Sequence, residues 1–252
     1  MIPPTYVITL NEDLGEQGVA LRNVGLNPIL FRGIDARKDE HLQYVDKISP
    51  LCLKTCPKSA IGCGLSHVLL AQKIYYTGAS IALILEDDAY PKIENLYEEI
   101  SKTLNEVPDD WEIIKLHCDI HCKDGQNRVG VNFSAAAYLI NRKGMEIMMN
   151  TKVQRHIDSQ QLMILKVYKS KVNLFWTHER KVSTNRIQQT SFVSNILDVV
   201  HPVTSGEKTW DDALSYKLIR IPFMNIEMNW FMTLKLIFIF IILIILFFYL
   251  KK

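Results

Sequence analysis

The stretch Ile81–Asp88, with the sequence IALILEDD, decides the fold. It follows the turn-forming segment Gly78–Ser80 and ends in three consecutive acids, Glu86, Asp87 and Asp88. An apolar run of this length between a glycine and a charged segment is typical of a buried strand in an α/β sheet. Open α/β sheets bind ligands outside the carboxyl ends of their strands. The three acids fall at such an end, so they are the first candidates for a functional site.

The three adjacent carboxylates repel one another, and the fold must offset that cost. A hard divalent cation is the simplest way to do so. The alternative is a solvated turn after the strand, because Asp is common in turns. For the triplet alone the turn is favoured. The surrounding sequence has to decide between the two.

Strand-like and helix-like segments alternate along the chain. We predict strands over residues 6–10, 28–31, 81–85, 111–116, 133–140 and 172–176, the last as a central strand. We predict helices over 11–24, 59–76, 93–104, 141–149 and 156–168, with an irregular segment over 34–57. Ser59 is the expected N-cap of the second helix, and Gly78 its C-terminal stop. This alternation predicts an α/β fold with a mostly parallel central sheet flanked by helices.

Residues 230–250 are almost entirely apolar, and Lys235 is their only charged residue. About 20 such residues span a bilayer as a helix, so we predict a C-terminal transmembrane helix. Residues 201–229 are polar and weakly periodic, as expected of a linker or flap. The N-terminus lacks the basic and apolar segments of a signal peptide. We therefore expect a single-pass membrane protein whose globular domain faces the cytosol.

The net charge of +2 is small, and no block of Lys or Arg stands out, which argues against nucleic acid as a partner. The chain has five cysteines, an odd number that argues against a fully paired disulfide framework. We expect free thiols. A structural zinc site built from two C-x-x-x-C pairs is the alternative. The cysteines are Cys52, Cys56, Cys63, Cys118 and Cys122.

One face of the predicted helix over 59–76 consists of small residues and one histidine. Its members follow helical spacing: Ala60, Cys63, Gly64, His67 and Ala71. Such a face lets a ligand or another element approach the helix closely. From spacing alone, His67 is better explained as a core histidine bonded to backbone.

The sequence resembles glycosyltransferase family 25. This family includes bacterial lipooligosaccharide β-galactosyltransferases and the collagen hydroxylysine galactosyltransferase domains. The similar segments, in chain order, are Tyr6–Asn11 (YVITLN), Gly33–Ala36 (GIDA), Ala60–His67 (AIGCGLSH), Leu83–Ala89 (LILEDDA), Trp111–Leu116 (WEIIKL), Ala136–Gly144 (AAYLINRKG), Ile157–Asp158 with Gln161, and Ser191–Ile196 (SFVSNI). Together they predict a catalytic domain over residues 1–200.

The resemblance implies a GT-A fold, a nucleotide-sugar donor and a divalent metal, Mn²⁺ or Mg²⁺, at the acidic triplet. It assigns Glu86 to the nucleoside side and Asp88 to the metal, and leaves Asp87 open between the two roles. Ser66 and His67, in the AIGCGLSH segment, are further substrate-binding candidates. Oxygen ligands suit these metals, and the metal would act as a Lewis acid on the diphosphate leaving group.

An inverting transfer also needs a base for the acceptor hydroxyl. The resemblance points to Asp158, whose alternative role is the N-cap of a helix. A further metal ligand of this class is often a histidine from a later segment. His178 is the best-placed candidate, ahead of His156 and His201, although for each of them taken alone a surface histidine is favoured over a ligand.

The implied function is transfer of a hexose, galactose or glucose, from a UDP-sugar to a hydroxyl of a glycan, lipooligosaccharide or protein acceptor. A role in lipopolysaccharide biosynthesis follows from the same resemblance. The alternative is an inactive, membrane-tethered carbohydrate-binding relative. A phosphotransfer enzyme is disfavoured because the chain has no P-loop. The family's arginines after the opening strand are missing here, with Arg22, Arg32 or Arg37 as possible substitutes.

Overall fold

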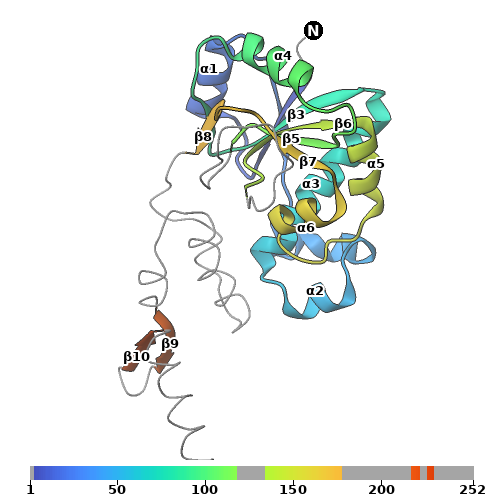
Figure 1. The fold of residues 1–252 in the computed structure, drawn as a ribbon. Helices are drawn as coiled ribbons and strands as arrows, with labels where there is room; N and C mark the ends of the chain where they lie inside the picture. Colours follow the sequence, from blue (N-terminus) through green and yellow to red (C-terminus); the bar gives the residue numbers. More distant parts are fainter. Residues whose placement is uncertain (1–2, 118–133, 178–216, 222–225, 230–252) are drawn as a thin grey trace, which may run out of the picture. The chain divides into compact units, whose positions relative to one another are not determined.

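The computed structural model describes residues 3–117, 134–177, 217–221 and 226–229. The chain forms two units, Met1–Ser191 and Phe192–Lys252. All the helices described below belong to the first unit, as does the six-stranded sheet at its centre (Figure 1). In the second unit, β9 (Lys217–Ile221) pairs with β10 (Ile226–Asn229) in an antiparallel hairpin, which lies inside the segment predicted as a linker.

The central sheet has the strand order β2-β1-β3-β6-β5-β7. Its strands are β1 (Thr5–Thr9), β2 (Pro28–Arg32), β3 (Ile81–Glu86), β5 (Ile113–Lys115), β6 (Ala137–Asn141) and β7 (Val167–Lys169). β1 pairs in parallel with β2 and β3, and β5 pairs in parallel with β7. β6 runs antiparallel to β3 and β5. The predicted α/β class with a mostly parallel sheet is confirmed, and the reversed β6 is the feature that was not predicted.

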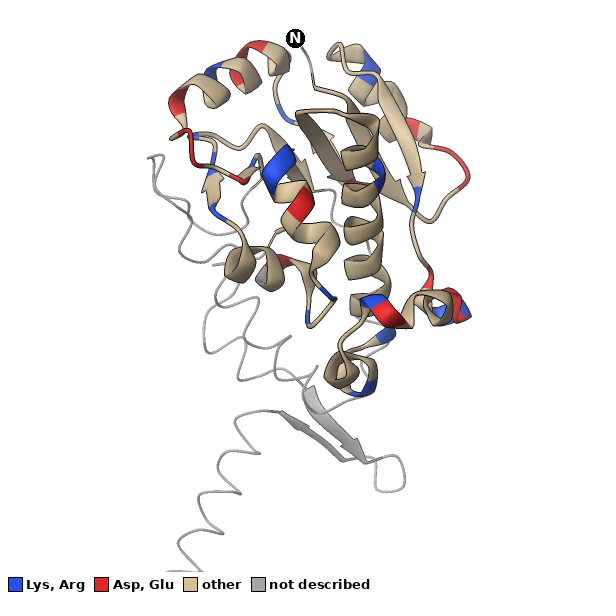
Figure 2. Cartoon of the chain, turned by 90° about the vertical axis from the view of Figure 1, so that its right-hand side faces the viewer, with Lys and Arg blue, Asp and Glu red and all other residues tan. Residues whose placement is uncertain are grey.

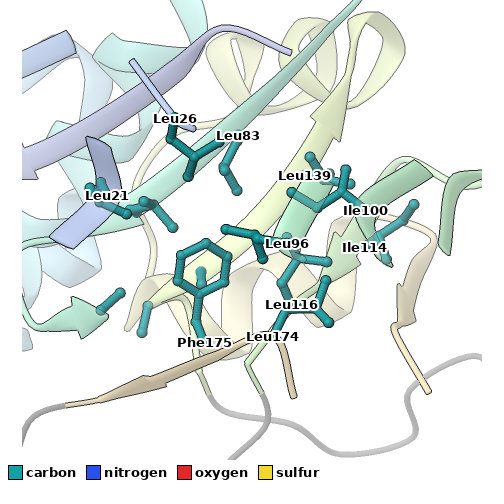
Figure 3. Packing of buried hydrophobic residues seen from close by; sticks show 14 of the residues in the cluster. Leu21, Leu26, Leu83, Leu96, Ile100, Ile114, Leu116, Leu139, Leu174 and Phe175 are labelled. Carbon is teal, nitrogen blue, oxygen red and sulfur yellow. The ribbon is translucent and has the colours of Figure 1, made fainter. Parts of the chain in front are cut away.

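Two hydrophobic clusters cover the two faces of the sheet. The first joins α1 (Gly15–Asn23) and α4 (Leu96–Glu106) to one face, through residues such as Leu21, Leu96 and Leu83 (Figure 3). The second joins α3 (Lys58–Thr77), α5 (Arg142–Asn150) and α6 (Ile157–Ile164) to the other face. Because side chains alternate along β3, Leu83 and Leu85 belong to the first cluster and Ala82 and Ile84 to the second. Helices on both faces explain why β3 is a continuous apolar run.

The irregular segment between β2 and α3 contains three short helical stretches: the 3₁₀ helices η1 (Ala36–Lys38) and η2 (Glu40–Lys47), and α2 (Pro50–Thr55). It approaches α3 closely at Gly62, and the loop after α5 approaches α3 at Gly64. A Cβ on Gly62 would lie 2.5 Å from the carbonyl oxygen of Ile34, and a Cβ on Gly64 would lie 2.7 Å from Cγ1 of Val153. Gly62 therefore lets backbone approach the helix, and Gly64, on the small-residue face of α3, leaves room for the Val153 side chain.

Two predictions about helix boundaries need correction. The N-cap of α3 is Pro57 and not Ser59, because the helix already begins at Lys58. Its end is as predicted, since Gly78 has the left-handed φ of 82° that favours glycine. The helix expected over 156–168 ends at Ile164, and the residues after it form the edge strand β7. Pairing with β5 overrides the helical pattern there.

The segment predicted as the last central strand also belongs elsewhere. β8 (Phe175–Thr177) pairs antiparallel with β4 (Ala89–Pro91) in a separate two-stranded sheet. β4 follows the acidic triplet directly. Its pairing with β8 therefore brings residues 175–177 close to the end of β3. The error has a local cause, because both strands have three residues and too little sequence to reveal their partner.

The expectation of free thiols is wrong for two cysteines, because Cys52 and Cys56 form a disulfide at one end of α2. These two sulfurs are therefore not zinc ligands in this structure. Cys63 is a free thiol. Cys118 and Cys122 lie outside the described residues.

In the parts of the chain that the structure describes, no helix is long and apolar enough to cross a membrane. The transmembrane helix predicted over 230–250 lies outside those parts. Figure 2 shows acidic and basic positions interspersed over the helices and loops of the first unit, as expected from a net charge of +2.

Candidate active site

The acidic triplet forms the connection from β3 to β4. Glu86 is the last residue of β3, Asp87 and Asp88 form a turn, and Ala89 begins β4. Because β1 and β3 are parallel neighbours, with Ile8 opposite Glu86, the end of β1 lies beside this turn. Thr9 Oγ1 donates a hydrogen bond of 2.9 Å to Asp87 Oδ2. The ends of two parallel strands thus meet at the acids, as the sequence predicted for a site of this kind.

Asp87 and Asp88 line a cleft of about 510 Å³. The other lining residues come from the end of β1, the loop after it, the first turn of α1 and the small β4–β8 sheet. They are Thr9, Asn11, Asp13, Leu14, Gly15, Glu16, Gln17, Tyr90 and Trp176. A volume of this size is typical of a small-molecule site. The two aspartates are therefore available to a ligand in the cleft and are not merely part of a surface turn.

Gln17 on α1 forms hydrogen bonds to both ends of the acidic turn, a role that was not predicted from the sequence. Its side chain is 3% exposed, and Nε2 donates to the carbonyl oxygens of Glu86 at 2.8 Å and Ala89 at 2.7 Å. The two carbonyls flank the Asp87–Asp88 turn. Both amide protons of one side chain therefore hold the two ends of the turn that presents the acids.

An aromatic pair lies beside the acids. Tyr90 and Trp176 are cross-strand partners in the β4–β8 sheet, and their ring centroids are 5.6 Å apart. Both rings line the cleft, and the Trp176 residue is 42% exposed. Nothing in the sequence suggested this pairing, although Tyr90 follows Asp88 by only two residues. Aromatic rings at this position can pack against the flat face of a base or a sugar.

Glu86 points away from this cleft, towards α3. Its Oε1 is 3.1 Å from His67 Nε2 and 3.7 Å from Cys63 Sγ. On the other side of the ring, His67 Nδ1 is 2.7 Å from the hydroxyl of Tyr138 on β6. His67 and Tyr138 are fully buried. The triplet is thus divided between two environments, since Glu86 is not among the described residues that line the cleft.

The environment of Glu86 favours the protonated forms of the Cys63 thiol and the Tyr138 hydroxyl. Burial, followed by the charge of Glu86, raises the pKa of the Cys63 thiol well above its ordinary value. The same two causes raise the pKa of the Tyr138 hydroxyl. A neutral tyrosine can donate to His67 Nδ1, and a ring with its proton on Nε2 then donates to Glu86. This chain of hydrogen bonds fixes the orientation of the Glu86 carboxylate.

Asp158 lies in the first turn of α6 but does not cap it, because the N-cap residue is His156. The side chain of Asp158 is 16% exposed, and its Oδ2 is 3.5 Å from His156 Nδ1. Its charge contributes to the raised pKa values of Cys63 and Tyr138, so it belongs to the Glu86 side of the triplet. The described residues that line the cleft do not include it.

Among the remaining candidates, Ser66, Arg32 and Arg37 bond to other parts of the protein, and His178 lies outside the described residues. Ser66 is buried and serves the fold, because its Oγ accepts from the backbone N–H of Ile34 at 2.8 Å and donates to the carbonyl of Gly62 at 2.7 Å. Arg37 binds Asp35 through two hydrogen bonds of 2.6 and 2.9 Å, and Arg32 donates to the carbonyl of Leu10 at 2.6 Å. His178, the predicted metal ligand, lies outside the described residues.

The cleft offers the ligand chemistry expected for the predicted metal. Asp87 and Asp88 bring carboxylate oxygens, and such oxygens are the ligands that Mn²⁺ and Mg²⁺ prefer. No sulfur or imidazole is among its described lining residues. The residues present therefore fit a hard divalent cation.

An α/β sheet with an acidic cleft at its strand ends defines a class of protein that binds small, charged ligands at this edge. Residues 3–134 match the model of glycosyltransferase family 25, described as an LPS biosynthesis protein family. That match covers more than half of the chain, so the protein belongs to glycosyltransferase family 25. The predicted family is confirmed. No curated protein sequence matches the chain.

Solved structures with a related arrangement are distant. A glycosyltransferase involved in glycosylation of the major capsid of PBCV-1 is 10% identical, with a TM-score of 0.37, and the match covers 59% of this chain and 63% of that one. A mutant of Drosophila β-1,4-galactosyltransferase 7, in complex with manganese, UDP-Gal and xylobiose, is 11% identical. Its TM-score is 0.42, with 76% of each chain covered. HddC from Yersinia pseudotuberculosis, complexed with GMP-PN, is 16% identical, with a TM-score of 0.37 and coverage of 69% and 92%.

Proposed function

We propose that this family 25 protein is a metal-dependent, inverting glycosyltransferase of the GT-A type. It transfers galactose or glucose from a UDP-sugar to a hydroxyl of a glycan, lipooligosaccharide or protein acceptor. The observation that carries the proposal is the position of Asp87 and Asp88. They line one cleft at the joined ends of β1 and β3, where a nucleotide diphosphate can reach both.

Asp87 and Asp88 would hold Mn²⁺ or Mg²⁺, with His178 as a further ligand candidate. When bound, the metal supplies Lewis-acid stabilisation of the negative charge on the diphosphate leaving group. The protein contributes the orientation of the ligands. Thr9 holds one oxygen of Asp87 by its hydrogen bond of 2.9 Å, and Gln17 holds both ends of the turn.

The aromatic pair and the segment after β1 bind the donor in this proposal. Asn11, Gly15, Tyr90 and Trp176 line the same cleft as the two aspartates. A planar base or the apolar face of a sugar can pack on the exposed Trp176 ring. Asp87 and Asp88, in the same cleft, then face the diphosphate.

Asp158 is the proposed general base. It accepts the proton of the acceptor hydroxyl while that oxygen bonds to the anomeric carbon and the bond from this carbon to the diphosphate oxygen breaks. The nucleoside diphosphate leaves with the bonding electrons. The support for Asp158 is its place in the segment that resembles the family, since this carboxylate is not among the described residues that line the cleft.

We also propose that residues 230–250 anchor the protein in a membrane by a single C-terminal helix, with the catalytic domain in the cytosol. The support is the length and apolar composition of this segment. Protease treatment of sealed cytosol-side-out vesicles tests the topology. The proposal predicts digestion of the domain, and protection of the domain would contradict it.

The alternative is an inactive relative that binds carbohydrate. Hydrolysis of UDP-galactose and UDP-glucose by the purified chain, with and without Mn²⁺, distinguishes the two functions. The enzyme should show Mn²⁺-dependent release of UDP, reduced by about 100-fold or more in Asp88→Asn. The matched control is Glu12→Gln, an exposed acid of the same region that does not line the cleft, and it should retain activity. Absence of Mn²⁺-dependent hydrolysis with every UDP-sugar would favour the inactive relative.

A further inference from the structure

A second group of possible metal ligands lies on the other side of the acidic triplet. Cys63 and His67 are one turn apart on α3, so their side chains project from the same face of the helix. Glu86, at the end of β3, meets them. One ligand atom from each residue lies within 4.8 Å of the other two.

The distances match those around a single small ion. His67 Nε2 and Glu86 Oε1 are 3.1 Å apart, and Cys63 Sγ and Glu86 Oε1 are 3.7 Å apart. Zinc binds nitrogen, oxygen and sulfur at about 2.0–2.3 Å in a tetrahedron, which places its ligand atoms about 3.2–3.8 Å from one another. Both distances to Glu86 therefore already fit one shared ion, and the sulfur and the imidazole nitrogen lie within 4.8 Å of each other.

The donor set selects the metal. A thiolate sulfur, formed as Cys63 releases its proton to solvent on metal binding, an imidazole nitrogen and a carboxylate oxygen suit Zn²⁺, whereas Mn²⁺ and Mg²⁺ prefer oxygen alone. A hydrogen bond on the other side of the ring also orients the imidazole. The Tyr138 hydroxyl lies 2.7 Å from Nδ1, and Nε2 is directed at Glu86. With zinc on Nε2 the ring carries its proton on Nδ1 and donates it to the Tyr138 oxygen, the reverse of the metal-free arrangement described above, and outer hydrogen bonds donated by the ring are usual for zinc-bound histidines.

We propose that Cys63, His67 and Glu86 bind a zinc ion, separate from the cation proposed for the cleft. None of the three is among the described residues that line the cleft, so the two sites use different ligands. An ion here would link α3 to the end of β3 and fix the position of Glu86, the residue that precedes the Asp87–Asp88 turn. The proposal stands independently of the glycosyltransferase function, since it needs no sugar nucleotide.

Cobalt provides the direct test, because Co²⁺ bound to a thiolate absorbs strongly in the near ultraviolet while Zn²⁺ is silent. Cys118 and Cys122 could give the same signal, so the test uses the 252-residue chain with both changed to serine. The expected result is an absorption band that saturates at one Co²⁺ per chain and disappears when Zn²⁺ is added. No band, in a chain with unchanged circular dichroism, overturns the proposal.

Three further variants in this background identify the ligands. Cys63→Ser should abolish the band, and a band that survives this change refutes the site. Tyr138→Phe keeps all three ligands but removes the outer hydrogen bond, so Co²⁺ affinity should fall by about 10–100-fold. Asp88→Asn should leave the band unchanged, whereas its loss would show that the two sites are one.

Should Cys63→Ser fail to fold, thermal unfolding with His67→Gln decides. Zn²⁺ should raise the melting temperature of the parent chain and leave that of His67→Gln unchanged. An equal rise in both would contradict the assignment. Failure of the glycosyltransferase proposal would appear separately, as absence of UDP-sugar hydrolysis with an intact cobalt band.

Discussion

Replacement of Gln17 by leucine should destabilise the acidic turn without changing the size of the side chain. The two hydrogen bonds from Nε2, at 2.8 and 2.7 Å, are lost, so the partly buried carbonyl of Glu86 and the buried carbonyl of Ala89 each lose a partner. A buried polar group left unsatisfied costs about 1–3 kcal/mol. Two carbonyls are affected, and other contacts can offset part of this cost. We therefore expect the free energy of unfolding to fall by about 2–4 kcal/mol.

Urea denaturation measures this loss. With a slope of about 2–3 kcal/mol per molar urea, the midpoint should fall by about 1 M. Gln43→Leu is the matched control, because Gln43 is exposed and the change there should stay within about 0.5 kcal/mol. Affinity for Mn²⁺ in the cleft should fall in Gln17→Leu as well, since the turn carries Asp87 and Asp88. Equal stability of the two variants would refute the reasoning.

Three other measurements test the site and the fold. Thr9→Val removes the donor to Asp87 with little change in shape, so Mn²⁺ affinity in the presence of UDP should fall by about 10-fold; calorimetry showing no change would argue against this role. Because burial and the Glu86 charge raise the pKa of Cys63, its alkylation by iodoacetamide at pH 8, followed on its own peptide by mass spectrometry, should be slower than that of free cysteine. Arg37 lowers the pKa of the Asp35 carboxyl, so the pair stabilises the fold above the unfolded pKa of about 3.9 and less as the pH falls through the lower folded value. The cost of Asp35→Asn, about 1–3 kcal/mol at pH 7, should therefore shrink in acid unfolding titrations, and a constant cost would contradict the pair's contribution.

The elements of the fold that could be predicted are those with a strong local pattern. The run Ile81–Leu85 is apolar at every position because helices cover both faces of the sheet, and α3 has 20 residues and a glycine stop. The pairing of β4 with β8 could not be predicted in the same way. Each of these strands has three residues, and their partnership depends on contacts between distant parts of the chain.

The same division applies to the site. The position of Asp87 and Asp88 at the carboxyl end of a sheet strand could be predicted because they follow an apolar run; their role as ligands stays a prediction. The direction of the Glu86 side chain could not, since neighbouring residues of a turn share their sequence signal but not their orientation. Gln17 escaped notice because a polar residue on a surface helix is ordinary, and only the tertiary structure shows that it is 3% exposed.

The central claim is that Asp87 and Asp88 bind the cation of a sugar-nucleotide site. Electron paramagnetic resonance of Mn²⁺ measures this directly, because the signal of free Mn²⁺ falls as the ion binds to the protein. With UDP present, the chain should bind one Mn²⁺ that Asp88→Asn loses and Cys63→Ser retains. Equal binding by the chain and by Asp88→Asn would contradict the account.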